Sequence, residues 1–171
     1  FLTAVISAGA TTFGDAVGGA IALTSLTTDS AGSVAINGGS VTTTGTQTYN
    51  GAVTLGADTA LTTTDSLVWF KSTVGNSSAR ALSISSGSGG VTFANTVGAS
   101  TALGALSITS SGTSTLSGAV SAASLSSGSG TTAIHGGSVT TTGTQTYNGA
   151  VTLGADTALS TTNSQITFSD I

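Results

Sequence analysis

The sequence predicts an all-β protein, a right-handed parallel β-helix or β-solenoid, and three observations predict it. Short apolar segments rich in Val, Thr and Ile, which favour strands, run through the whole chain. Glycine or Asn-Gly recurs every five to eight residues, as at tight corners, and no 3.6-residue apolar stripe indicates a helix. Long internal repeats complete the pattern, because periods near 20 residues are typical of solenoids.

The strongest repeat pairs residues 38–66 with residues 136–164, which agree at 27 of 29 positions at an offset of 98. A weaker one pairs residues 11–32 with residues 91–112 at an offset of 80. The difference of 18 is supplied by one extra unit, residues 113–130. Units of about 18–20 residues divide both offsets, so we expect about nine stacked coils in a single segment covering residues 1–171.

Each coil should contain three short strands joined by tight corners. Val, Leu, Ile, Ala and Phe are expected inside, and Thr and Ser outside. The corners Asn50-Gly51 and Asn148-Gly149 suggest either turns with positive φ or a stacked Asn ladder. Such a coil is too small to bury its own apolar face, so its stability must come from its neighbours.

Comparison of the two copies indicates one candidate interaction site. Residues 67–70 read Leu-Val-Trp-Phe, where residues 165–168 read Gln-Ile-Thr-Phe. Because strand side chains alternate, Val68 and Phe70 should point inward, and Leu67 and Trp69 outward. An exposed Trp in a Thr/Ser surface is typical of a contact with another chain, a neighbouring segment or a glycan. The alternative is that residues 71–80 fold over Trp69 and bury it.

Composition argues against several functions. Charged residues are 5% of the chain, the net charge is −4 and the only bases are Lys71 and Arg80, so we expect no nucleic-acid partner. The sequence has no run of 18 apolar residues, so it predicts no membrane-spanning helix. It also has no cysteine that could form a disulfide or a thiolate metal site.

Candidate reactive groups are few and scattered. Asp58 and Asp156 occupy equivalent corners in the two copies, and Asp65 is replaced by Asn163. The single histidine, His135, aligns with an asparagine before Gly-Gly, which indicates an exposed corner. We therefore expect no catalytic site, no cofactor, no metal and no enzymatic activity. Because some carbohydrate-active enzymes share the β-helix fold, a carbohydrate-active enzyme remains an alternative function.

Threonine pairs suggest a third function, since ice-binding solenoids present flat arrays of T-x-T pairs. Such a surface needs a pair in nearly every coil, and residues 81–130 offer mixed Ser and Ala instead. The pairs in the first copy are Thr42-Thr44, Thr46-Thr48 and Thr62-Thr64.

The motif GGSVTTTGTQTYNGAVTLGADTAL, with its VTF and QITF flanks, resembles the repetitive β-helical region of filamentous-haemagglutinin-like exoproteins. These are large bacterial surface proteins exported by two-partner secretion or autotransport. The resemblance implies an extracellular or cell-surface location and a role as a stiff spacer in a fibre or adhesin. We expect the segment to belong to a longer array or to self-associate, end to end or laterally, with a host or matrix glycan as a further partner. The alternative functions are a glycan-binding or carbohydrate-active β-helix and an ice-binding solenoid.

Overall fold

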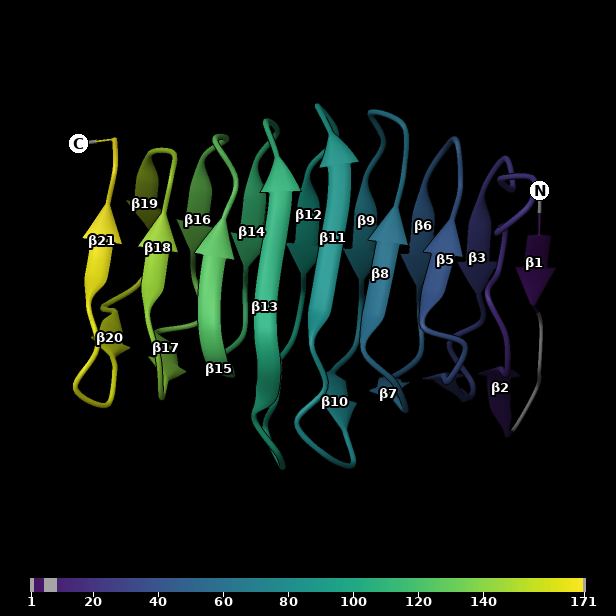
Figure 1. Ribbon diagram of the computed structural model, residues 1–171, viewed down its shortest axis with the longest axis horizontal. Helices are drawn as coiled ribbons and strands as arrows, with labels where there is room; N and C mark the ends of the chain where they lie inside the picture. Colours follow the sequence, from purple (N-terminus) through teal and green to yellow (C-terminus); the bar gives the residue numbers. More distant parts are fainter. Residues whose placement is uncertain (1, 5–8, 171) are drawn as a thin grey trace.

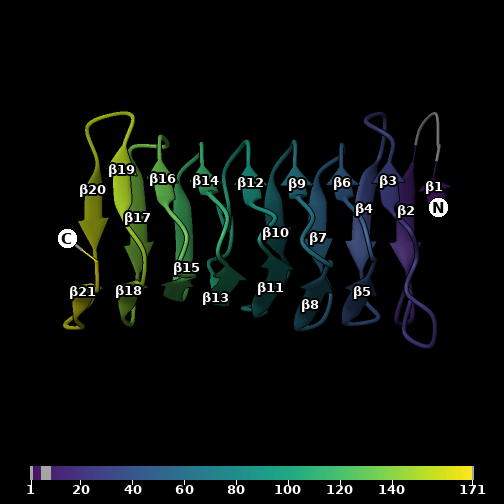
Figure 2. The same ribbon diagram turned by 90° about the horizontal axis from the view of Figure 1, so that it is seen from above.

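The computed structural model describes residues 2–4 and 9–170, which form parallel strands and no helix. The strands stack into a rod with three faces, as predicted, and the N-terminal and C-terminal strands lie at opposite ends (Figure 1; Figure 2). Face A contains β1 (Leu2–Ala4), β3 (Leu26–Thr28), β6 (Gln47–Tyr49), β9 (Val68–Phe70), β12 (Val91–Phe93), β14 (Ser114–Leu116), β16 (Thr132–Ile134) and β19 (Val151–Leu153).

The other two faces follow face A in each turn of the chain. Face B contains β2 (Ala10–Phe13), β4 (Ser33–Ile36), β7 (Val53–Leu55), β10 (Val74–Asn76), β17 (Ser138–Thr141) and β20 (Ala158–Ser160). Face C contains β5 (Ser40–Thr42), β8 (Thr59–Thr62), β11 (Leu82–Gly87), β13 (Leu103–Ser110), β18 (Gln145–Tyr147) and β21 (Ile166–Phe168). The long strand β15 (Val120–Ser127) belongs to both, because its first half pairs with β17 and its second half with β18.

The rod has about eight turns, close to the nine predicted. The register on face A shows why the number is lower. One turn takes 18 residues between Ser114 and Thr132, the unit identified as an insertion, but 24 residues between Leu2 and Leu26. The longer turn has more residues outside strands, because its β2 has four residues whereas β15 of the shorter turn has eight.

Like side chains stack on like side chains in the core. On face B, valines occupy six successive turns, each paired with the next and each at most 2% exposed. Burial of one such side chain contributes about 1.5–3 kcal/mol. The members of this valine ladder are Val34, Val53, Val74, Val97, Val120 and Val139.

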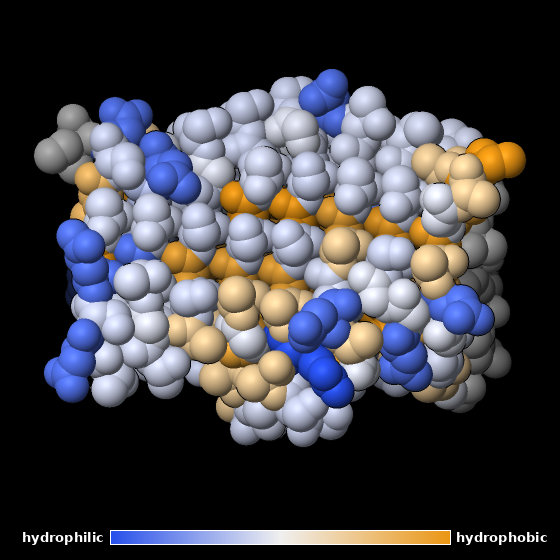
Figure 3. Space-filling view, viewed as in Figure 1, coloured by the Kyte–Doolittle hydropathy of each residue, from blue (hydrophilic) through white to orange (hydrophobic). Residues whose placement is uncertain are grey.

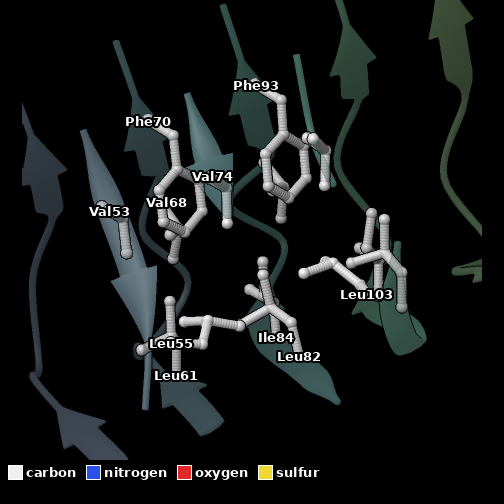
Figure 4. Packing of buried hydrophobic residues seen from close by; sticks show 14 of the residues in the cluster. Val53, Leu55, Leu61, Val68, Phe70, Val74, Leu82, Ile84, Phe93 and Leu103 are labelled. Carbon is white, nitrogen blue, oxygen red and sulfur yellow. The ribbon is translucent and has the colours of Figure 1, made fainter. Parts of the chain in front are cut away.

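Aromatic rings form a second ladder, inside face A. The ring centroids of Tyr49 and Phe70 are 5.0 Å apart, and those of Phe70 and Phe93 are 4.9 Å apart. The rings are nearly parallel, at 11° and 2°, and Figure 4 shows the two phenylalanines aligned above the aliphatic core. These spacings match the ~4.8 Å between neighbouring strands, so the backbone ladder sets the ring stack.

A buried polar network accompanies the aromatic stack and was not predicted. Gln47 is fully buried and its Nε2 donates to the carbonyl oxygens of Val41 (3.1 Å) and Thr62 (3.0 Å). The hydroxyl of Tyr49 donates to Gln47 Oε1 at 2.9 Å. The second copy repeats the arrangement around Gln145, so the network belongs to the repeated unit.

Corner glycines are required by the close approach of successive turns. Gly112, Gly130 and Gly149 stack at the corner between faces C and A. A Cβ added at Gly130 would overlap the carbonyl oxygen of Gly112, and one at Gly149 would overlap that of Gly130. These three turns therefore need a residue without a side chain at this corner.

The Asn-Gly corners also allow successive turns to approach closely. The expectation that they are turns with positive φ is wrong. Asn50 and Gly51 are not among the residues with positive φ. The side-chain amide of Asn50 donates to the carbonyl oxygen of Thr28 in the preceding turn, and Gly51 allows close contact with Gly32. Asn148 donates to the carbonyl oxygen of Ser127 at 2.5 Å in the same way. Asparagine thus hydrogen-bonds two turns together.

The two long copies lie on different faces, which corrects the expectation that whole coils separate them. From Gln47 on face A, the register passes through Val68, Val91 and Ser114 to Thr132, which is four turns. The equivalent of Gln47, Gln145, lies two faces further on, against Leu125 of face C. The offset of 98 residues therefore equals four and two-thirds turns, and the second copy is rotated by one-third of a turn.

We predict that Gly130→Ala destabilises the chain by about 3 kcal/mol, because the new Cβ overlaps backbone that has no room to move. Gly75→Ala is the matched control, since a Cβ there would meet no heavy atom of the described residues within 4 Å. Chemical denaturation followed by circular dichroism measures both. Equal stability of the two variants would contradict the stacking of these corners.

A second prediction concerns alkaline pH. Burial raises the pKa of Tyr49 and of Tyr147 well above the usual value near 10. The unfolded chain loses these protons above about pH 10 and the folded chain keeps them, so the free energy of unfolding should fall by about 1.4 kcal/mol per pH unit for each tyrosine. The phenolate absorbance and the loss of circular dichroism should then rise together. Phenolate formation near pH 10 in a folded chain would contradict this burial.

Candidate interaction surfaces

The outer surface of face C consists mostly of small hydroxyl side chains. Ser83, Ser107 and Ser126 lie side by side in successive turns, and Thr62, Ser85 and Thr109 form a parallel row. Figure 3 shows these pale rows with hydrophobic atoms between them and only scattered strongly hydrophilic spots. A shallow groove of about 610 Å³ runs along this face and is lined mainly by Ser, Thr and Gly. Such a surface can form many hydrogen bonds, and the carboxylate of Asp65 lies at its edge.

The threonine pairs do not gather on one face. Thr42 and Thr62 are neighbours on face C, whereas Thr48 lies on face A. Because the second copy is rotated, its equivalent of Thr48, Thr146, lies on face C beside Ser126. The outward row of face A is also interrupted by a tryptophan and an alanine, since it reads Thr27, Thr48, Trp69, Thr92, Thr115, Ala133, Thr152.

Trp69 points outward from β9, as the comparison of copies predicts. Its side chain is 36% exposed, while Val68 and Phe70 on either side of it are fully buried. Leu67, just before the strand, is half-buried. Residues 74–76 form β10 on face B, so the alternative in which the segment after Trp69 buries it is wrong.

Lys71 adds a charge to this patch. Its Nζ lies 4.4 Å from the centroid of the Trp69 ring, a cation–π contact. Thr48 and Thr92 flank the ring in the neighbouring turns. The patch around Leu67 and Trp69 is therefore a flat aromatic surface with one cation and adjacent hydroxyls, which suits lateral contact or the apolar face of a sugar ring.

Two of the six aspartates stabilise corners through backbone hydrogen bonds. Asp58 Oδ1 accepts a hydrogen bond from the backbone N–H of Ala81 at 3.0 Å, and Asp65 Oδ1 accepts one from Ser88 at 2.8 Å. Asp65 has φ of 50° and its counterpart Asn163 has φ of 55°, a conformation that both residue types tolerate, which explains their exchange. His135 is exposed and packs against Gly154, as Asn37 does against Gly56. In the described ranges, no three His, Cys, Asp or Glu side chains lie close enough together to hold a metal.

The last turn forms a second hollow, of about 510 Å³, with an apolar lining. Leu153 is 61% exposed and Phe168 is 40% exposed, and Val151 and Leu159 are half-buried.

 The same positions in the first copy are fully covered by the following turn. Val151 and Leu159, which line this hollow, pack against the buried core.

No helix long and apolar enough to cross a membrane occurs in the described part of the chain. No family model matches this chain, and no curated protein or solved structure compared with it matches it. The fold and the surfaces described above are therefore the basis for a functional proposal.

We predict that Trp69→Thr, which copies the second repeat, changes the free energy of unfolding by less than about 1 kcal/mol, because the ring is outside the core. Lateral association, measured by sedimentation velocity at high protein concentration, should weaken. Phe70→Thr is the contrasting variant, since it opens the aromatic stack and should destabilise the chain strongly. An unfolded Trp69→Thr variant would contradict this assignment of faces.

Proposed function

We propose that this chain is a structural repeat segment of an extracellular bacterial fibre or surface adhesin, in which it acts as a stiff spacer. The observation that carries the proposal is the ladder of parallel strands, which continues on all three faces through about eight turns. Its surface, by contrast, is mostly small hydroxyl side chains. Such a molecule is suited to provide length and rigidity rather than chemistry.

Stiffness follows from the way the turns are joined. Each interior turn is hydrogen-bonded to both neighbours on three sides, so bending the rod in any direction stretches one ladder of backbone hydrogen bonds. Eight turns at ~4.8 Å give a rod of roughly 38 Å. Adding turns lengthens the rod without changing its cross-section, which is the property required of a spacer.

Folding after export is consistent with the same architecture. Each turn contacts mainly the turns before and after it, so a chain that emerges unfolded can fold turn by turn. The absence of cysteine from the sequence avoids disulfides that would form too early. These features, with the resemblance to filamentous-haemagglutinin-like exoproteins, support a location outside the cell.

A glycan-binding role is the second candidate, and Trp69 favours it. An exposed indole can stack on the apolar face of a sugar, and the flanking threonines can hydrogen-bond to its hydroxyls. However, Lys71 already lies over the ring, which reduces the open aromatic surface. Binding to host or matrix glycans that is lost in Trp69→Thr would support this role.

We predict that antibodies against residues 1–171 label intact cells of the source bacterium, or fibres released from them, without permeabilisation. The chain should also resist a broad-specificity protease, because its backbone is hydrogen-bonded throughout the rod. A cytosolic protein of known location serves as the control for cell integrity. Labelling only after lysis would contradict the proposal.

A further inference from the structure

We propose that the β9 patch, formed by Asp65, Leu67, Trp69 and Lys71, is a lateral contact between two parallel copies of this chain, in which Lys71 of each copy faces Asp65 of the other. This inference rests on the proposed structural function, because it names the partner and the direction in which segments of the fibre lie side by side. Figure 1 shows β9 near the middle of the rod, where β6 and β12 flank it, so complete turns surround the patch.

The internal repeat shows that this patch is specialised. Residues 38–71 and 136–169 differ at six positions, and four of these are the alternate positions 65, 67, 69 and 71. The first copy has Asp, Leu, Trp and Lys there, where the second copy has Asn, Gln, Thr and Ser. The positions between them keep their character, because Ser66 and Phe70 are identical and Val68 is replaced only by Ile. The buried side of the strand is therefore preserved, while its outward side changes from neutral polar to apolar and charged, as at an interaction site.

The structure arranges the two charges of the patch on opposite sides of the indole ring. The Nζ of Lys71 lies 4.4 Å from the centroid of the Trp69 ring, so the positive charge is on the outer side of face A. Asp65 is exposed at the corner where face C leads into face A. Its Oδ1 accepts a hydrogen bond from the backbone N–H of Ser88 at 2.8 Å, which holds the carboxylate at this corner. A negative charge therefore precedes the ring along the chain, and a positive charge follows it.

This order of charges is complementary to itself, which identifies the partner as a second copy. In a two-fold symmetric contact, the same patch of both copies meets, and each pairing of two residues occurs twice. If the two-fold axis runs along the rod, the facing β9 strands are antiparallel, and Asp65 of each copy meets Lys71 of the other. If the axis runs across the rod, the facing strands are parallel and like charges meet. The charges therefore select two rods that point in the same direction, as segments of a fibre bundle would.

The apolar centre of the patch fits the same arrangement. The two Trp69 rings lie next to the symmetry axis, where aromatic rings prefer offset stacks with centroids ~4.5–7 Å apart. Leu67 is half-buried and adds apolar surface before the strand. Thr48 and Thr92, on either side of Trp69, are small enough to let the rings approach. A contact centred on one strand buries less than the ~1,200 Å² of a stable complex, so a single pair of segments should associate weakly.

Charge reversal tests the pairing. Asp65→Lys and Lys71→Asp each place like charges opposite one another, so each variant alone should associate at least about tenfold more weakly than the unmodified chain in sedimentation velocity at high protein concentration. An equimolar mixture of the two variants should recover association, because every charge of one then faces the opposite charge of the other. Asp58→Lys is the matched control, since Asp58 is exposed and also accepts a backbone hydrogen bond, but lies at the corner between faces B and C. Circular dichroism checks that each variant is folded. Asp65→Asn is a milder variant, because Asn163 adopts the same conformation with φ of 55°, and it should weaken association about threefold.

Cross-linking tests the direction of the two rods, because the chain has no cysteine of its own. Thr27 and Thr115 lie in the outward row of face A, two turns before and two turns after Trp69. In parallel rods, the thiols of two Thr27→Cys copies face each other across the ~10 Å that separates packed sheets, so a bifunctional thiol reagent of that reach should join them. In antiparallel rods, the same two thiols are about four turns, or roughly 19 Å, apart along the axis, and Thr27→Cys would be joined to Thr115→Cys instead.

The expected result is that Thr27→Cys alone gives cross-linked dimers, and that these predominate over mixed dimers when Thr115→Cys carrying a mass tag is added. Mixed dimers in excess would overturn the parallel arrangement. Monomers of the unmodified chain at high concentration, or association that charge reversal leaves unchanged, would overturn the contact between copies. None of these outcomes decides the spacer function, which the cell-labelling experiment tests separately.

Discussion

Parallel stacking of successive turns at ~4.8 Å is the constraint on which the rest of the structure depends. It places each strand residue next to a residue of the neighbouring turn, so side chains of similar size and polarity pack against one another. Valine stacks on valine along face B, and Phe70 stacks between Tyr49 and Phe93 on face A. At the corner where Gly130 lies between Gly112 and Gly149, the same spacing leaves no room for a Cβ.

The rotation between the two copies follows from a mismatch between sequence period and turn length. A 98-residue offset spans four and two-thirds turns, so nearly identical sequences face different directions. Thr48 and Thr146 consequently lie on faces A and C. The repeat therefore preserves the inside of the coil while spreading its surface groups around the rod. That outcome suits a spacer better than a surface that must present one continuous array.

Strand content, the parallel solenoid, the extra turn at residues 113–130 and the outward Trp69 could all be predicted from the sequence, because each leaves a local pattern. The rotation could not, because it depends on corner lengths that vary between turns. The buried Gln47 was also missed, since a polar side chain in a Thr-rich strand resembles a surface residue. The alternation in Gln47-Thr48-Tyr49 does carry a signal, because it places Gln and Tyr on the same side.

The buried Gln–Tyr network resolves a difficulty that this composition creates. Strands of Thr, Ser and Ala define their register weakly, because a slip by one residue exchanges similar side chains. Gln47 removes that freedom, since its amide must reach the carbonyl oxygens of both Val41 and Thr62 while accepting the Tyr49 hydroxyl. A slipped strand would bury these groups without partners, at a cost of about 1–3 kcal/mol each. The network thus specifies one register in each copy, and the regular ladders on either side of it inherit that register.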